Sequence, residues 1–269
     1  MLAWLKTQWM EVLQAIEEVE QESLLDQGLQ PQRSLHLDII GVTTLACIIL
    51  TILEFYGSSG DWNWLAKTAG LVDESYAKAI KQFFRDPKYG RLHRLGYWSM
   101  STFVGYMIVP MLWVKFVMGR SLRGMGLSGN GVFRHSWVYL LLYLVVLPAV
   151  YLVSGTPSFQ ATYPFYNHAG RSLYDFLIWE LFYGIQFMSL EFFFRGFLIH
   201  GLKRRFGFYA IFVSVIPYCM IHFGKPLPEC IGSILAGVVL GAFSLFTGSI
   251  WLGVLIHISV AVSMDIFAL

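Results

Sequence analysis

Charged residues are scarce in this sequence. Only 13% of its 269 residues are Asp, Glu, Lys or Arg, whereas 56% are hydrophobic. A soluble domain carries about 25% charged residues, so this composition argues against a water-soluble globular protein. The few charges also avoid the long apolar runs, which indicates that the chain finds its low-dielectric environment in lipid. We therefore expect a multi-pass integral membrane protein that contacts the lipid bilayer, with the plasma (inner) membrane as its expected location.

Cysteine is equally scarce, and its placement argues against two classes of small stabilised domain. The three cysteines are Cys47, Cys219 and Cys230, and the sequence contains no C-x-x-C motif. An odd number of cysteines without paired spacing supports neither a disulfide framework nor a cysteine zinc site. The sequence also lacks a run of basic residues interleaved with aromatics, so we expect no nucleic-acid partner.

Long apolar runs predict the fold. A membrane-spanning helix needs about 20 apolar residues, and seven segments reach or approach that length. These segments are 37–55, 95–118, 136–154, 174–200, 207–223, 229–247 and 250–268, of which 207–223 is the shortest. The predicted fold class is therefore all-α, a polytopic transmembrane helical bundle of about seven spans.

The remaining segments suggest how the chain is organised. Apolar residues recur at helical spacing opposite an acidic face near the start of the chain, which predicts an N-terminal amphipathic helix within 1–36. Residues 56–93 hold most of the remaining charge and predict an extramembrane or interface-lying helical insert. We therefore expect N-terminal spans within 37–170, interrupted by that insert, and a separate C-terminal core at 171–269.

Ionisable residues are few within the C-terminal spans. Such a side chain costs several kcal/mol in hydrocarbon and marks either function or a buried pair. Glu191 and Arg195 are four residues apart, so they lie on one helix face and can pair. His222 and His257 come from two further spans. At a rise of about 1.5 Å per residue, these three helices can bring the carboxylate and both imidazoles to a common depth if the short span is tilted or bent at Pro217.

This set of side chains suits hydrolysis. A desolvated glutamate is a usable general base for activating water, and a second histidine can stabilise the oxyanion that forms when water attacks an amide. Glu191, His222 and His257 could equally bind a divalent metal such as zinc, as two histidines and one glutamate. The sequence leaves both mechanisms open. For Glu191 and Arg195 taken alone, a structural ion pair is the simpler interpretation.

The same residues resemble the CAAX protease and bacteriocin-processing family, a group of intramembrane glutamic or metallo-endopeptidases. That family has three motifs, E-E-x-x-x-R, F-x-x-x-H and H-x-x-x-N. In this sequence they read Leu190-Glu191-x-x-x-Arg195, Tyr218-x-x-x-His222 and His257-x-x-x-Ala261, within about residues 174–268. The resemblance implies that Glu191, Arg195, His222 and His257 are catalytic residues.

Two positions depart from the family motifs. Leu190 stands where the family has the first glutamate, which the resemblance implies is the water-activating base, and Ala261 stands where it has an asparagine oxyanion donor. Either Glu191 serves as the base alone, or the protein has lost peptidase activity.

We therefore expect an intramembrane endopeptidase that cuts a membrane-anchored protein or peptide. Glu191 and His222 would activate the water, His257 would stabilise the oxyanion, and Arg195 would orient Glu191. The alternative is a catalytically inactive relative that acts as a membrane scaffold or chaperone. A transporter that uses Glu191 and Arg195 as a gating pair would need polar residues along several spans, and the spans at 37–55 and 136–154 have almost none.

Overall fold

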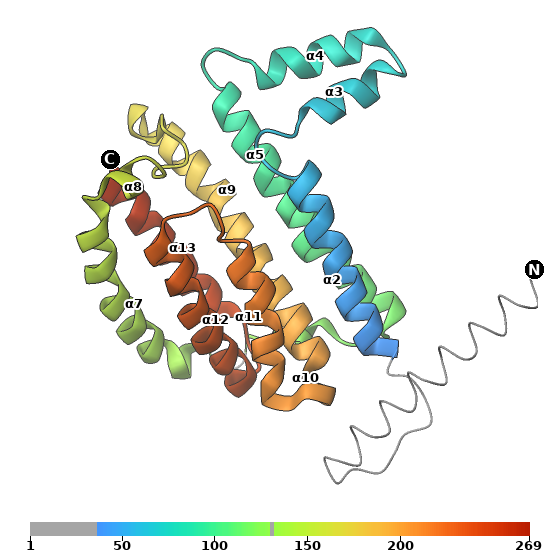
Figure 1. Cartoon of the computed structure of the whole chain (residues 1–269), viewed down its shortest axis with the longest axis vertical. Helices are drawn as coiled ribbons and strands as arrows, with labels where there is room; N and C mark the ends of the chain where they lie inside the picture. Colours follow the sequence, from blue (N-terminus) through green and yellow to red (C-terminus); the bar gives the residue numbers. More distant parts are fainter. Residues whose placement is uncertain (1–36, 130–131) are drawn as a thin grey trace, which may run out of the picture. The chain divides into compact units, whose positions relative to one another are not determined.

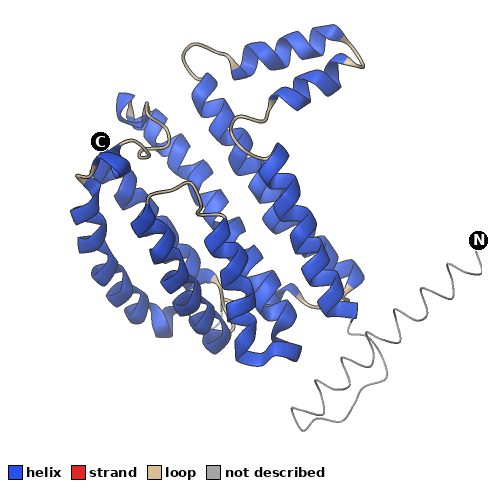
Figure 2. Ribbon diagram, in the orientation of Figure 1, coloured by secondary structure: helices blue, strands red, loops and turns tan. Residues whose placement is uncertain are grey.

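The computed structural model of the protein describes residues 37–129 and 132–269, and within these ranges it contains helices but no strand. The all-α prediction is therefore confirmed, while the amphipathic helix expected at 1–36 lies outside the described residues. The chain divides into two units, residues 1–41 and 42–269. The second unit holds the candidate site and is described below (Figures 1 and 2).

The helices of the first half are α2 (Leu37–Tyr56), α3 (Asn63–Gly70), α4 (Glu74–Phe84), α5 (Gly90–Thr102), α6 (Val109–Leu112), α7 (Val132–Ser154) and α8 (Pro157–Gln160). Those of the second half are α9 (Leu173–Glu191), α10 (His200–Phe206), α11 (Ala210–Met220), α12 (Leu227–Thr247) and α13 (Trp251–Ala268). One π-helical segment, Phe103–Ile108, joins α5 to α6, and a second, Trp113–Val117, follows α6. Together they make Gly90–Val117 one helical stretch. A third, Phe192–Ile199, joins α9 to α10.

In the described part of the chain, six helical stretches are long and apolar enough to cross a membrane, namely Asp38–Tyr56, Gly90–Val117, Ser136–Ser154, Leu173–Met220, Leu227–Thr247 and Trp251–Ala268. The 48-residue stretch Leu173–Met220 reverses direction at Gly207, whose φ of +52° suits glycine. Its two legs, α9–α10 and α11, correspond to the spans expected at 174–200 and 207–223. The protein is thus a multi-pass integral membrane protein, and the count is close to the seven spans predicted.

The insert expected at 56–93 forms a helical hairpin of α3 and α4 at the ends of α2 and α5 (Figure 1). Asp73 caps α4 by accepting a hydrogen bond from the Ser75 backbone N–H. Trp62 and Ala66 pack against Phe84 in a small hydrophobic cluster that holds the two helices together.

Helices α11 and α12 pack closely in the C-terminal part because α12 presents small residues. A Cβ atom on Gly237 would lie 2.9 Å from Val215 Cγ2, and one on Gly241 would lie 3.0 Å from both Ile199 and Ile211 side chains. Small residues of this kind let membrane helices approach one another. On its other side the bundle is completed by α13, which packs on α7 and α9.

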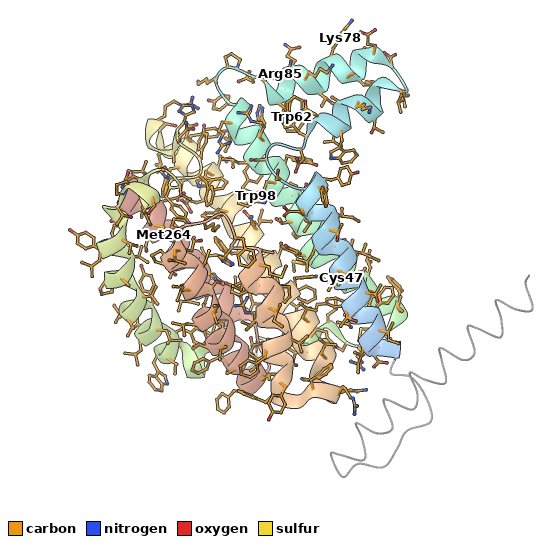
Figure 3. The ribbon with its side chains drawn as sticks, in the orientation of Figure 1. Cys47, Trp62, Lys78, Arg85, Trp98 and Met264 are labelled. Carbon is orange, nitrogen blue, oxygen red and sulfur yellow. The ribbon has the colours of Figure 1, made fainter. Side chains whose placement is uncertain are left out.

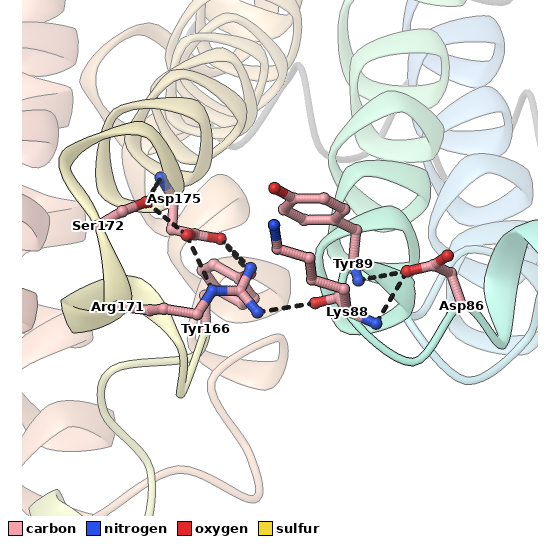
Figure 4. A network of polar contacts seen from close by, with 7 residues as sticks. All are labelled: Asp86, Lys88, Tyr89, Tyr166, Arg171, Ser172 and Asp175. Atoms are coloured by element: carbon pink, nitrogen blue, oxygen red, sulfur yellow. Dashed lines mark hydrogen bonds and ion pairs between the residues drawn. The ribbon is translucent and has the colours of Figure 1, made fainter.

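A polar network fixes the start of α9 (Figure 4). Ser172 caps the helix by accepting from the Asp175 N–H, and the buried Asp175 carboxylate accepts from the Arg171 guanidinium and the Tyr166 hydroxyl. Arg171 also donates to the Lys88 carbonyl, 3.0 Å away. This network ties the helix that carries Glu191 to the segment before α5.

Candidate active site

Glu191 and Arg195 lie where α9 changes into a π-helix. Glu191 is the last residue of α9, and Arg195 lies within the π-helical segment Phe192–Ile199, all of which is buried. Their side chains are only 1% exposed, and Arg195 Nη1 lies 3.3 Å from Glu191 Oε1. Single π-helical turns within α-helices occur frequently at functional sites. The four-residue spacing predicted the pairing, whereas the π-helical geometry has no signature in the sequence.

His257 of α13 is the direct partner of Glu191. Its Nδ1 lies 2.6 Å from Glu191 Oε1, and its Nε2 lies 2.9 Å from the Tyr218 hydroxyl. Because an ionised carboxylate only accepts hydrogen bonds, His257 Nδ1 carries the proton and Nε2 accepts from Tyr218. The imidazole also stacks on Phe187, with ring centroids 5.2 Å apart. A hydrogen-bonded series therefore runs from Tyr218 through His257 to Glu191.

Tyr218 of α11 lies at the centre of the site. The Arg195 guanidinium lies 4.0 Å from the centroid of its ring, a cation–π contact, and its side chain is almost fully buried. The sequence indicated Tyr218 only as an aromatic position of a motif. Sequence reasoning missed the importance of its hydroxyl. The family motif has phenylalanine at this position, which cannot form a hydrogen bond to His257, so the presence of tyrosine here was the available signal.

His222 borders the site but does not pair with Glu191. It lies in the turn after α11, where its Nδ1 donates to the Tyr218 carbonyl at 2.8 Å, and its ring meets the Tyr218 ring edge to face at 4.8 Å. Burial, together with the nearby Lys225 ammonium, lowers the pKa of His222 to about 4. The imidazole is therefore neutral at neutral pH, with the lone pair of Nε2 available. The expected partnership of Glu191 with His222 is taken instead by His257.

Gly253 makes room for the Glu191 carboxylate, and sequence reasoning did not find it. A Cβ atom at this position would lie 2.5 Å from Glu191 Oε2. That oxygen is buried and has no hydrogen-bond partner among the described residues. Gly253 precedes His257 by four residues, so both lie on one face of α13. A glycine one turn before a membrane histidine was the available signal.

Comparison with known proteins points to the same part of the chain as the geometry of the site. Residues 173–263 match the family described as Type II CAAX prenyl endopeptidase Rce1-like. This part of the chain is similar to that family. The matched residues include Glu191, Arg195, Tyr218, His222 and His257. Neither the curated proteins nor the solved structures gave a significant match.

The two departures from the CAAX protease motifs are both apolar side chains in packed surroundings. Leu190 is 8% exposed, and Ala261 is 3% exposed and packs in a cluster with Trp179 and Tyr183. Neither contributes a polar group to the site. The Tyr218 hydroxyl, by contrast, lies 2.9 Å from His257 Nε2.

A metal-binding arrangement is not formed by these residues. Within 37–129 and 132–269, no three His, Cys, Asp or Glu side chains gather as a group that could hold a metal ion. Both ring nitrogens of His257 already have hydrogen-bond partners, and one of the His222 nitrogens bonds to a backbone carbonyl. The ligand set Glu191, His222 and His257 stays a prediction.

Proposed function

We propose that this protein is an intramembrane endopeptidase that hydrolyses a peptide bond in a membrane-anchored protein or peptide. The observation that carries the proposal is the buried hydrogen-bonded series Tyr218–His257–Glu191. A carboxylate that fixes the tautomer of a histidine is a recurring device for making that histidine a general base. The match to the CAAX protease family supports the same reaction class.

In the proposed reaction His257 is the general base. A water molecule attacks the carbonyl carbon of the scissile amide while His257 Nε2 takes its proton. The proton then passes to the amide nitrogen as the C–N bond breaks, which releases an amine and a carboxylic acid. Glu191 remains ionised throughout and stabilises the imidazolium through Nδ1–H, at 2.6 Å. Arg195 keeps the carboxylate charged and oriented. These contacts favour the general-base role for His257, in place of the oxyanion-stabilising role first expected for it.

The Tyr218 hydroxyl is the proposed oxyanion donor. It has to turn from His257 Nε2 towards the substrate oxygen when His257 takes the proton. This assignment supplies a donor in a site where Ala261 stands in place of the family's asparagine. His222, which is neutral and borders the Tyr218 ring, is proposed to hold the attacking water through its Nε2 lone pair.

The access route is proposed to lie on the His257 side of the site. The side chain of His257 is 16% exposed, whereas that of Glu191 is 1% exposed. A substrate therefore meets the imidazole first. This difference in exposure suits a division of labour in which Glu191 acts through His257 rather than on the substrate directly.

The test is cleavage by the purified protein in detergent. A library of membrane-anchored peptides is incubated with the wild type and with Glu191→Gln, and products are identified by mass spectrometry. Loss of a positioned acid–base group costs about 10²–10⁴-fold in rate, so Glu191→Gln is expected to lose cleavage by that factor. Glu180→Gln is the matched control, because Glu180 lies on the same helix eleven residues before Glu191.

The inactive scaffold or chaperone is the second candidate, favoured by the apolar side chains of Leu190 and Ala261. It predicts that wild type and variants bind intact peptides equally and cut none of them. A third arm adds a chelator and then zinc. If the chelator abolishes cleavage and zinc restores it, Glu191, His222 and His257 act as metal ligands and the roles proposed above are wrong.

A further inference from the structure

The hairpin of α3 and α4 exposes large apolar side chains outside the membrane-spanning stretches. Leu71 and Val72, at its tip, are each 82% exposed, and Trp64 is 39% exposed. Apolar area left in water costs about 25 cal/mol per Å², and a patch of this kind marks an interaction surface. The partner of this surface can be inferred from what lies next to it.

Helix α3 is two-sided. Trp64 and Leu71 are seven residues apart, or two helical turns, so they share one face. Ala66 lies on the other side, where it is 1% exposed and packs with Phe84 of α4. The face with Trp64 and Leu71, which also carries the exposed Lys67 and Thr68, therefore points away from α4, and the packing between the two helices leaves it uncovered.

This face continues the lipid-facing surface of the spans. A groove of about 430 Å³ between α2 and α5 is lined almost wholly by apolar side chains, and Trp64 and Tyr97 lie among its lining residues. The Trp64 indole N–H donates to the Tyr97 hydroxyl at 2.7 Å and lies 3.3 Å from the Tyr56 carbonyl. Tryptophan and tyrosine with apolar bodies and satisfied polar tips are typical of the headgroup level of a bilayer.

The opposite side of the hairpin is charged. Lys78 and Glu74 of α4 have side chains that are 74% and 80% exposed, and they form a 3.4 Å ion pair. Figure 3 shows Lys78 on the outer side of the hairpin. Exposed apolar residues thus lie on α3 and at the tip, with Tyr76 and Phe83 of α4 also exposed, while Glu74 and Lys78 place charge on α4. A helical hairpin that exposes both apolar and charged side chains suits the boundary between lipid and water.

We propose that the α3–α4 hairpin binds the bilayer surface, with Trp64, Leu71 and Val72 in the boundary between headgroups and acyl chains. Helix α4 then lies above α3 with its charged side in water. The ligand is the lipid surface itself. Interfacial helices bury their apolar face about 5–10 Å into this boundary, and the short connections to α2 and α5 keep the hairpin at that level.

The test uses the full chain in vesicles of phosphatidylcholine and phosphatidylglycerol. Cys47, Cys219 and Cys230 are replaced, and the thermal transition of this background is matched to that of the wild type. A nitroxide label is then placed singly at Leu71→Cys, Val72→Cys or Lys78→Cys. All three positions are exposed in the protein, so protein burial cannot separate them. Collision rates with oxygen, which concentrates in lipid, and with a water-soluble nickel chelate are measured at each.

The expected result is a several-fold higher oxygen-to-nickel ratio at positions 71 and 72 than at position 78. Equal access of the nickel chelate to all three positions would overturn the proposal, because the hairpin would then stand in water. Protection of positions 71 and 72 from both probes would also overturn it, and would indicate a protein partner on this face. Diluting the protein in lipid then shows whether that partner is a second copy.

Discussion

At the scale of single residues, the most demanding feature is a buried carboxylate with one unpartnered oxygen. Glu191 Oε1 is held by His257 and Arg195, whereas Oε2 faces Gly253. A charge removed from water is tolerated only when its partners are fixed in good geometry. The space beside Gly253 is therefore as much a part of the site as the charged groups.

Gly253→Ala is expected to damage the site through this space. The added methyl group would lie 2.5 Å from Glu191 Oε2, which forces the carboxylate or α13 to move. Overpacking of this kind costs about 1–3 kcal/mol, so both the thermal transition and peptide cleavage should fall. Gly232→Ala is the matched control, because nothing lies within 4 Å of its added Cβ atom. Equal effects of the two variants would contradict the close approach at Gly253.

Tyr218→Phe separates the hydroxyl from the ring. The ring that contacts Arg195 is kept, so the fold should be retained, while the proposed oxyanion donor is lost. Removing one such donor costs about 10²–10³-fold in kcat, with little change in KM. Steady-state cleavage kinetics measure both parameters. A variant with unchanged kcat would show that the hydroxyl only positions His257.

His222 predicts a stability effect in mild acid. Its folded pKa of about 4 lies below its ordinary value of 6.5, because burial and Lys225 disfavour the charged form. The unfolded chain therefore binds a proton first as the pH falls, and stability is lost progressively between those two values. The thermal transition of wild type should drop more from neutral pH to about pH 4 than that of His222→Gln. Parallel curves for the two proteins would contradict the assignment.

At the scale of elements, α9 and α13 are joined at two levels. Glu191 and His257 form one junction, and the Trp179 indole N–H donates to Asp265 at 2.6 Å in the other. Both Trp179 and Asp265 are fully buried. The two contacts fix the rotation of α9 and α13 about their helix axes, and this rotation determines which face of α13 meets Glu191.

Asp265→Ala is expected to loosen this pair of helices. It leaves the Trp179 N–H buried without its acceptor, which costs about 1–3 kcal/mol. The double variant with Trp179→Phe should recover part of that loss, because the stranded donor is then removed as well. Thermal unfolding of the two single variants and the double variant gives the coupling. Strict additivity would show that the hydrogen bond contributes nothing measurable.

Sequence patterns predicted the elements better than the contacts between them. Apolar runs of about 20 residues mark spans because the bilayer demands that length, and the pairing of Glu191 with Arg195 follows from helical spacing. The sequence gives a residue's depth along a helix but not the rotation of that helix against its neighbours. For this reason both histidines were expected beside Glu191, whereas only His257 of α13 bonds to it and His222 bonds to the Tyr218 carbonyl. The π-helical segment at Phe192–Ile199 changes that rotation further.

At the scale of the whole molecule, loops that contact one another indicate which ones share a membrane face. Tyr163 donates to Glu229 at 2.7 Å, and Lys225 lies over the Phe165 ring, so the segment before α9 meets the turn between α11 and α12. At the other end Leu127 pairs with Ser249. These contacts assign the loops around Leu127 and Ser249 to the face opposite that of Tyr163 and Lys225.

Single cysteines should report this arrangement. In a background without the native cysteines, Ser158→Cys and Asp61→Cys are expected to react with an impermeant maleimide from the same side of sealed vesicles. Ser121→Cys should react only from the other side. The measurement compares right-side-out with inverted vesicles. Labelling of Ser158→Cys and Ser121→Cys from one side would contradict the described passage of α7 through the membrane.

The brevity of α11 has a consequence for how a substrate is selected. Its 11 residues rise only about 16 Å, roughly half of the hydrocarbon thickness of about 30 Å. The turn with His222 and Lys225 follows closely on Tyr218, which bonds to His257, so the site lies near this turn. A peptide tethered among the headgroups would need only a short free segment to reach His257. The distance of a peptide bond from the membrane anchor, more than the side chains around that bond, would then determine whether it is cut.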